Sequence, residues 1–362
     1  MLRLRSHTKV TPMSIAKDSS WEVDANDITL GDVIGRGSFG VVKRGTLHGM
    51  DVAIKIIAAS ASAKETEMAA MMLNREVKAL SRCQHQNIVR LIGACSDPPM
   101  LVLAFAAKGT LRDLLRHNYN DLSPSRKMEL LRGICDGMSM LHSKEILHLD
   151  LKPENVLISG DGTPWVADFG LAIAMTATLT GGAGSTKGGR GTMQYKAPEL
   201  FKTKRMGGAK YEKPADVYSF CMVVWEMFSG VVPFAGMPDN EITSMHLMVL
   251  LGQEDPERPP LLDSIPIEIV PLIEACWAQD PSARPTFVEI KAMLDTVTLV
   301  DPKMTRGKVC FSYRSLDKAR VEEAKIGLEK CGYSIFWGLD VDMMKATDWR
   351  NQWMVACDDA DI

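Results

Sequence analysis

The stretch HLDLKPEN, residues 148–155, is followed closely by DFG at residues 168–170. Asp150 could accept a proton from a hydroxyl group. Asn155 and Asp168 offer hard oxygen donors of the kind that Mg²⁺ prefers. Each piece alone is common, and the alternative interpretation is a surface turn with scattered carboxylates. The ordered set at this spacing favours a catalytic site.

Two lysines add to this interpretation. Lys152 could steady a phosphoryl group while it is transferred. Lys55 ends a buried apolar run, where an unpaired ammonium would be costly, although a lysine at a strand end can also extend its amine into water. Glu76, on the apolar face of a predicted helix, is the expected partner of Lys55, ahead of Glu65 and Glu67. Such a pair could orient the amine onto nucleotide phosphates.

A glycine-rich loop lies near the start of the ordered chain. It consists of Gly35, Gly37, Ser38, Phe39 and Gly40 within GRGSFGVV. Glycines let the backbone approach phosphate oxygens and donate N–H groups to them. The pattern also occurs in dinucleotide-binding folds, but there a helix follows the third glycine. Here the sequence continues as a strand, which disfavours that alternative.

Bulk composition narrows the class of protein. A chain of 362 residues is too long for one small core, so we expect two or three domains. The net charge of −3 gives no electrostatic support for nucleic-acid binding. There is no run of about eighteen apolar residues, so we expect no membrane span.

The termini and cysteines indicate location. Eight cysteines are spread along the chain without a Cys-x-x-Cys pair, which predicts reduced thiols and a cytoplasmic protein, with a nuclear one also compatible. Residues 1–20 are basic and lack the apolar core of a secretory signal. We expect a disordered basic tail, the alternative being a mitochondrial transit peptide.

Periodicity predicts two unlike halves. The first half is mainly strands with one helix at 64–83; the expected strands begin at Ile28 and cover 52–57, 88–95 and 101–105. The second half is helical, with helices expected at 126–143, 214–229, 267–278 and 286–297. We expect a cleft where the halves join, near residues 104–109. Residues 171–192 form a loop rich in hydroxyls and glycine, interpreted as regulatory rather than as a plain insert.

In their order along the chain, these motifs resemble the eukaryotic protein kinase family over residues 21–298, with Ala197-Pro-Glu199 as a further landmark. The resemblance implies an α+β, two-lobed kinase fold with a small β-rich N-lobe and a larger helical C-lobe. It implies ATP and Mg²⁺ as cofactors and proteins as substrates. The catalytic residues would be Asp150, Lys152, Lys55 and Glu76, and the metal ligands would be Asn155 and Asp168. Besides the glycine loop and Lys55, the implied nucleotide contacts are Val42, Ala53, Leu103, Phe105, Ala106 and Leu157. Asp216 and Arg284 would be structural, with Arg284 paired to Glu199.

Details within the motifs suggest a subgroup. Lys152 in DLKPEN and Thr192 before the Ala-Pro-Glu landmark resemble serine/threonine kinases, and the N-terminal and late landmarks look like the tyrosine-kinase-like group. Leu149 departs from the family, which usually has an Arg there that binds a phosphorylated loop residue. We therefore hypothesise weaker dependence on loop phosphorylation. Lys196, where Met is common, is a second departure.

After a linker at 299–307, residues 308–362 resemble the start of a Toll/interleukin receptor (TIR) domain. Strands are expected at Lys308–Tyr313 and Tyr333–Trp337. The resemblance implies a partial α/β unit and a possible TIR-containing partner, although the chain stops where the family's third strand should begin. The alternative is an unrelated β-α-β-α extension.

Three functions remain open. The first is an active serine/threonine protein kinase, since every residue of the mechanism is present. The second is a pseudokinase scaffold that binds through its TIR-like part, which a missing Lys55, Asp150 or Asp168 would have favoured. The third is an NAD-cleaving enzyme, which the incomplete TIR-like part disfavours.

Overall fold

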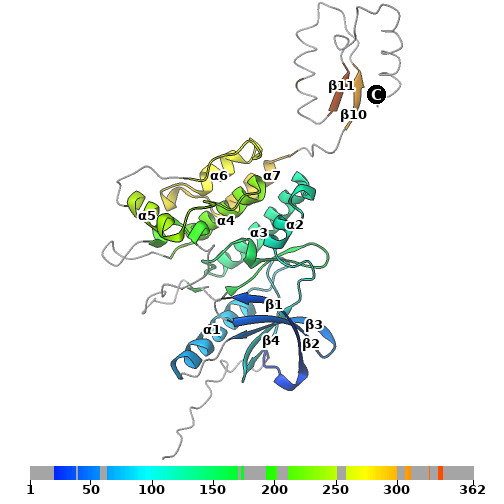
Figure 1. Cartoon of the computed structure of the whole chain (residues 1–362), viewed down its shortest axis with the longest axis vertical. Coiled ribbons are helices and arrows are strands. Elements are labelled where there is room, and N and C mark those ends of the chain that lie inside the picture. Colours follow the sequence, from blue (N-terminus) through cyan, green and yellow to red (C-terminus); the bar gives the residue numbers. More distant parts are fainter. Residues whose placement is uncertain are drawn as a thin grey trace, which may run out of the picture. The chain divides into compact units, whose positions relative to one another are not determined.

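A computed structural model describes residues 20–37, 40–57, 63–169, 173–174, 193–201, 211–250, 258–299, 306–310, 326 and 333–336. The chain separates into two compact units, Met1–Tyr119 with Glu129–Val297 and Asn120–Met128 with Thr298–Ile362. Nearly all of the predicted basic tail and of the loop 171–192 lies outside the described residues. The first unit holds every candidate site residue, in a sheet-bearing N-lobe and a helical C-lobe (Figure 1).

The N-lobe is built on a five-stranded antiparallel sheet of order β1-β2-β3-β5-β4. Its strands are β1 (Ile28–Gly37), β2 (Gly40–Leu47), β3 (Met50–Ile57), β4 (Leu91–Ser96) and β5 (Pro99–Ala104). Alternating apolar residues bury one cluster against this sheet, made of Leu47, Val52, Ile54, Cys95, Met100 and Val102. Gly40 has φ +151°, and a side chain there would collide with the Ile56 carbonyl, so the turn into β2 requires glycine.

The edge strand β4 is covered by the first described residues. The Val23 N–H donates to the Ala94 carbonyl at 3.0 Å, and the Ala94 N–H donates to the Trp21 carbonyl at 2.7 Å. Exposed sheet edges invite pairing with other chains. The segment before β1 therefore closes one edge of the N-lobe.

Helix α1 (Ala63–Arg82) packs against β4 and β5, and buries Leu73, Glu76, Val77 and Leu80. This helix confirms the one predicted at 64–83. The strand predicted at 88–95 was placed too early, because Ile88 forms a bridge with Val166 of the C-lobe and β4 begins only at Leu91.

The C-lobe is organised around a buried helix. Its helices are α2 (Leu111–His117), α3 (Pro124–Ser143), α4 (Lys213–Ser229), α5 (Asp239–Leu250), α6 (Val270–Cys276) and α7 (Phe287–Thr296). Every residue of α4 from Ala215 to Ser229 is buried, as its nearly continuous apolar sequence predicts. Helices α2 and α5 were not predicted from the sequence. The start of α2 is fixed by a capping box in which Thr110 and Asp113 satisfy each other's backbone N–H groups.

Two short ladders flank the stretch 148–155. Strand β6 (Ile146–Leu147) pairs with β9 (Ile173–Ala174), and β7 (Val156–Ile158) pairs with β8 (Pro164–Val166). Residues 148–155 therefore connect β6 to β7, while Asp168 lies two residues after the end of β8. The ladders fix both stretches to one place in the C-lobe.

The second unit contributes two described strands. Strand β10 (Arg306–Cys310) pairs in parallel with β11 (Tyr333–Phe336), with Val309 opposite Ile335. The predicted strands were Lys308–Tyr313 and Tyr333–Trp337. A parallel pair requires a crossover connection, which agrees with the expected β-α-β order. The residues between them are described only at position 326.

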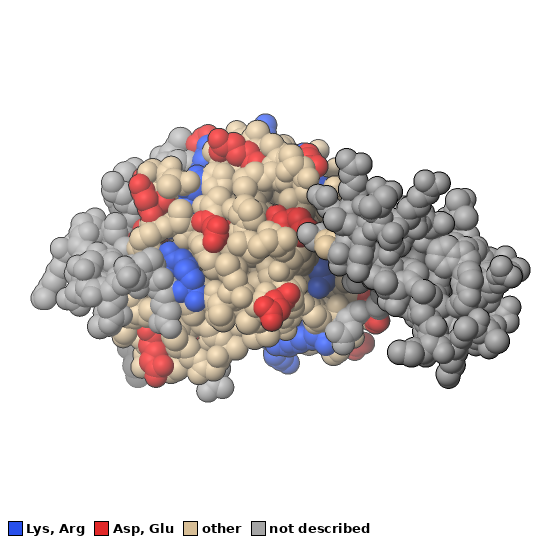
Figure 2. Space-filling model, turned by 90° about the horizontal axis from the view of Figure 1, so that it is seen from above, with Lys and Arg blue, Asp and Glu red and all other residues tan. Residues whose placement is uncertain are grey.

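Two predictions made from composition concern the surface charge and a membrane-spanning helix. Acidic and basic side chains lie interspersed on the described surface that Figure 2 displays. Within the described ranges, no helix combines the length and apolar character needed to span a bilayer.

Candidate active site

Asp150 is held from two sides. Lys152 Nζ donates to its Oδ2 at 2.8 Å, and Asn155 Nδ2 donates to the same oxygen at 2.9 Å and to the Asp150 carbonyl at 2.7 Å. Burial raises the pKa of the Asp150 carboxyl, and the positive charge of Lys152 opposes that rise. Both of these side-chain contacts use Oδ2, so a hydroxyl group brought to this carboxylate could donate to Oδ1.

The backbone before Asp150 is fixed by Asp216 of α4. This buried carboxylate accepts hydrogen bonds from the N–H groups of His148 at 2.9 Å and Leu149 at 2.7 Å, and it contacts His142 Nε2 at 2.9 Å. Leu149 has φ +65°, a left-handed conformation that costs a non-glycine residue energy. Asp216 therefore holds a strained turn that aims Asp150, in line with its expected structural role.

Lys55 lies between two carboxylates. Its Nζ is 2.8 Å from Glu76 Oε2 and 2.7 Å from Asp168 Oδ1, so the predicted pair with Glu76 is present. Burial alone would lower the pKa of Lys55, but the charges of Asp168 and Glu76 outweigh it and raise the pKa above its ordinary value. Burial raises the pKa of Glu76, and Lys55 opposes that rise. The contact joins β3, α1 and the segment after β8.

Asn155 and Asp168 are brought together by the β7–β8 ladder. The Ala167 N–H, next to Asp168, donates to the Asn155 carbonyl at 2.9 Å. Together they present an amide and a carboxylate, and no group of three or more His, Cys, Asp or Glu among the described residues could hold a metal. Mg²⁺ commonly binds one or two protein oxygens, with substrate phosphates and water completing its shell. The donor set fits a Mg²⁺ ion bound together with a phosphate substrate.

The expected nucleotide contacts surround the connection between the lobes. Ala53 and Leu103 are buried cross-strand partners in β3 and β5. Val42 and Leu157 are half-buried, and Leu157 bridges to Thr110 just after the connection.

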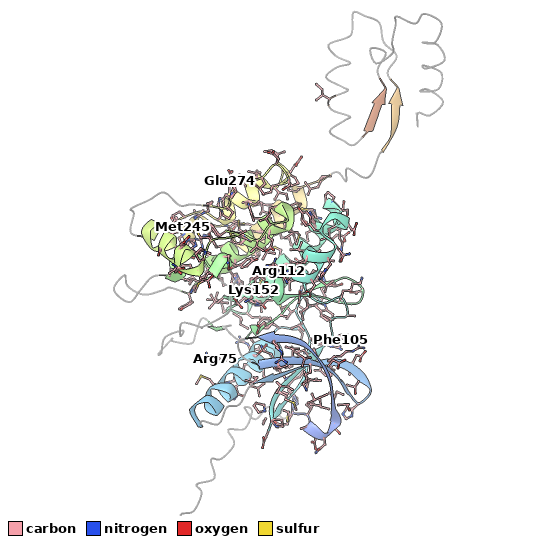
Figure 3. All side chains as sticks on the ribbon, in the orientation of Figure 1. Arg75, Phe105, Arg112, Lys152, Met245 and Glu274 are labelled. Carbon is pink, nitrogen blue, oxygen red and sulfur yellow. The ribbon has the colours of Figure 1, made fainter. Side chains whose placement is uncertain are left out.

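Phe105 and Ala106 form the connection itself, and the Arg44 guanidinium lies 4.7 Å from the Phe105 ring centroid. Figure 3 shows Phe105 at the N-lobe sheet and Lys152 in the C-lobe. Ser38 and Phe39 lie outside the described residues.

A network around Arg112 was not anticipated. This buried side chain contacts Glu154 at 2.8 Å, the Tyr195 hydroxyl and Glu226 of α4. It thereby links α2 (labelled at Arg112 in Figure 3), the stretch 148–155 and the segment before Ala197. No local pattern indicated this network, because an arginine within TLRDLLR is typical of an exposed helix face.

Arg284 behaves as expected. Its Nη1 and Nη2 contact the two carboxylate oxygens of Glu199 at 2.7 and 3.0 Å, so the predicted pair is confirmed. The guanidinium also donates to the carbonyls of Pro214 and Ala278. This contact anchors the Ala-Pro-Glu landmark to the body of the C-lobe.

Comparison with known proteins agrees with this geometry. Residues 28–294 match the family described as protein tyrosine and serine/threonine kinase. The chain is 32% identical over 304 residues to the serine/threonine/tyrosine-protein kinase HT1 of Arabidopsis thaliana, covering 83% of this chain and 73% of that protein. It is 34% identical over 276 residues to human mitogen-activated protein kinase kinase kinase 7, covering 74% of this chain. It is 31% identical over 276 residues to the dual specificity protein kinase pyk3 of Dictyostelium discoideum, covering 76% of this chain.

The relatives differ from this chain in extent. The matched region spans 41% of the human relative and 19% of the Dictyostelium protein. The family match ends at residue 294 and so does not bear on the TIR resemblance of residues 308–362.

Proposed function

The chain belongs to the protein tyrosine and serine/threonine kinase family, and we propose that it transfers the γ-phosphoryl group of Mg-ATP to serine and threonine hydroxyls of proteins. The observation that carries this proposal is the three-way contact of Lys55 with Glu76 and Asp168. It joins both lobes at the site where Asp150 presents its carboxylate. A scaffold without catalysis would not require a lysine held between two carboxylates, one of them partly exposed.

Asp150 acts on the substrate hydroxyl that accepts the phosphoryl group. Its Oδ1 accepts the hydrogen bond of the substrate hydroxyl and orients the oxygen for attack. Lys152, held at 2.8 Å from Asp150, places a positive charge where the phosphoryl group passes. Positioning and charge stabilisation account for most catalysis of this kind.

Lys55 and the loop glycines act on the nucleotide. Glu76 keeps the Lys55 ammonium in place, where it meets phosphate oxygens, and the backbone at Gly35, Gly37 and Gly40 approaches the phosphates. Asn155 and Asp168 would hold Mg²⁺, which when bound offsets the negative charge of the phosphate oxygens.

Adenine would lie between Val42 and Ala53 on one side and Leu157 on the other. Leu103 would bound this pocket, and the backbone at Phe105 and Ala106 would meet the base edge.

Serine and threonine are proposed as acceptors because Lys152 lies in DLKPEN. The relatives include proteins named serine/threonine/tyrosine and dual specificity kinases, so tyrosine is the competing acceptor. Incubation of the full chain with γ-labelled ATP and a generic protein substrate, followed by phosphoamino-acid analysis, separates the two. We expect labelled serine and threonine only; labelled tyrosine of comparable amount contradicts the preference.

The same assay tests catalysis itself. Asp150→Asn is expected to reduce transfer by about 10³-fold, in the range for a lost general base. Asp295→Asn is the matched control, because Asp295 is an exposed carboxylate paired with Arg132 in the C-lobe. Equal activity of the Asp150 variant and the wild type, or no transfer by either, would overturn the proposal.

We also propose that residues 308–362 form the beginning of a TIR-like unit that contacts a TIR-containing partner. The parallel pairing of β10 and β11 supports this proposal. Identical binding of TIR-domain proteins by the full chain and by a chain ending at Leu299 would argue against it.

A cytoplasmic location is proposed from the thiols, since the described cysteines that are free, Cys83, Cys95, Cys135, Cys221 and Cys276, are all buried. A fluorescent fusion of the full chain found in an organelle would contradict it.

A further inference from the structure

Lys196 follows Tyr195, which the Arg112 side chain joins to Glu154 of the stretch 148–155. It lies between the short 3₁₀ helices η5 (Met193–Tyr195) and η6 (Pro198–Phe201), and its N–H donates to the Met193 carbonyl at 3.2 Å. Tyr195 and Ala197 on either side are buried, and the Tyr195 hydroxyl belongs to the Arg112 network. The backbone that carries Lys196 is therefore held on both sides.

The ammonium of Lys196 differs from the two other lysine cations of the site. Lys55 and Lys152 each pair with carboxylates. Lys196 is half-buried, and no carboxylate in the described part of the chain lies within ion-pair distance of it. Its contact is with the face of Phe201, whose ring centroid lies 5.0 Å from Nζ. A partly buried cation without an anionic partner favours binding of an anion from outside.

Phe201 supports this cation without adding charge. Its other ring neighbour is His246 of α5, with centroids 4.8 Å apart. Both ring nitrogens of His246 are buried and have no hydrogen-bond partner among the described residues, and burial lowers its pKa to about 4. The imidazole is therefore neutral at physiological pH. His246 therefore adds no positive charge to that of Lys196.

The charged neighbour of Lys196 is Asp150. Burial lowers the pKa of the Lys196 ammonium, and the carboxylate of Asp150 acts in the opposite sense. Asp150 is already contacted by Lys152 and Asn155, so it does not serve as a dedicated partner of Lys196. A peptide that presents its hydroxyl to Asp150 brings its neighbouring side chains within reach of this cation.

We propose that Lys196 determines substrate specificity by binding an anionic side chain, a carboxylate or a phosphate, close in sequence to the acceptor hydroxyl. This inference rests on the proposed kinase activity, because it places the acceptor at Asp150. The substrate class is therefore an acidic or already phosphorylated segment of a protein. The contact positions the substrate and takes no part in the chemical step.

The test uses peptides that share one acceptor serine and differ at one neighbouring position. An Asp is moved one position at a time along a neutral peptide, and each peptide is paired with its Asn counterpart; the best position is repeated with phosphoserine. For the wild type we expect kcat/KM to favour the anionic peptide by about fivefold, mainly through KM, as for one partly exposed ionic contact. Lys196→Met should abolish the ratio, Lys196→Arg should keep it, and Lys196→Glu should favour a Lys-containing peptide.

The ratio within each enzyme is the readout, so a general loss of activity cancels. Lys213→Met, which removes an exposed lysine paired with Glu145, is the matched control and should keep the wild-type ratio. Thermal unfolding identifies any variant that fails to fold; if Lys196→Met fails, Lys196→Glu carries the test, and a preference for the anionic peptide as large as in the wild type would overturn the inference. An equal ratio in the wild type and the Met variant overturns the inference while transfer itself still occurs. Absence of transfer to every peptide instead contradicts the kinase function.

A third outcome would give Lys196 a different anionic partner. If Lys196→Met reduced activity only in enzyme phosphorylated on its own loop, with the peptide ratio unchanged, Lys196 would bind a phosphate of the chain itself. That result also overturns the inference.

Discussion

Two ion clusters of the first unit use the same chemistry in opposite ways. Arg284 is fully buried, and its partner Glu199 is 10% exposed. Lys55 is 12% exposed and shares its charge between a buried Glu76 and an Asp168 that is 38% exposed. The first cluster is closed to water and to ligands, whereas the second has an open side. Both clusters contain ion pairs, so the exposure of one partner is what distinguishes a cluster that can bind a ligand from one that only stabilises the fold.

Hydrogen bonding sharpens the difference. Arg284 satisfies both oxygens of Glu199 and two backbone carbonyls, so little capacity remains for another partner. Lys55 is a compact charge between carboxylates that come from different lobes. Such a lysine can exchange a carboxylate contact for a phosphate contact when a nucleotide binds.

The closed cluster should dominate stability. Arg284→Met leaves the Glu199 carboxylate and two carbonyls without their buried donor, so we expect the free energy of unfolding to fall by about 3–5 kcal/mol. Urea denaturation followed by tryptophan fluorescence measures this change. Lys213→Met, at an exposed pair, is the control and should cost less than about 1 kcal/mol. Equal losses in the two variants would show that burial of the Arg284 pair does not matter.

The open cluster should dominate activity. Lys55→Met removes the cation that meets the nucleotide phosphates, and we expect kcat/KM to fall by about 10²- to 10³-fold. Its unfolding free energy should fall by less than that of Arg284→Met, because Glu76, whose pKa burial already raises, can take up a proton. Glu76→Gln keeps the shape of the partner and should lose less activity than Lys55→Met. A Lys55 variant that lost stability more than Arg284→Met, with activity retained, would reverse the comparison.

The ionisation of Asp150 should set the pH dependence of activity on the acid side. Its carboxyl accepts a hydrogen bond from the substrate only when ionised, and burial raises its pKa above the ordinary value of 3.8. Activity should therefore be full above the raised pKa and fall as the pH drops through it. Lys152→Met removes the charge that opposes the rise, so the acid limb of its kcat/KM profile should move to higher pH. A shift to lower pH would contradict the assigned electrostatics, whatever the loss in maximum rate.

Long apolar patterns were predictable, and short or strained ones were not. The helix expected at 214–229 is α4, because an almost continuous apolar run has few alternatives to a buried helix. Strands β6 and β9 have two residues each, too few for any periodicity. The apolar face of the predicted helix anticipated the contact between Lys55 and Glu76.

The Arg112 network could not be anticipated in the same way. It depends on four side chains from separate parts of the chain, Arg112, Glu154, Tyr195 and Glu226, and no local pattern records such a meeting.

The smallest expected effect concerns phosphorylation of the loop after Asp168. Leu149, in the strained turn held by Asp216, offers an apolar side chain where a phosphate-binding cation would lie. We expect single Ala substitutions of the loop hydroxyls before Thr192 to change kcat/KM by less than about threefold. These residues are Thr176, Thr178, Thr180, Ser185 and Thr186. Leu149→Arg restores a cation without changing the need for a left-handed backbone, and should make activity sensitive to phosphatase treatment. Loss of wild-type activity through one site well before Thr192 would show that another residue supplies the phosphate contact that Leu149 cannot make.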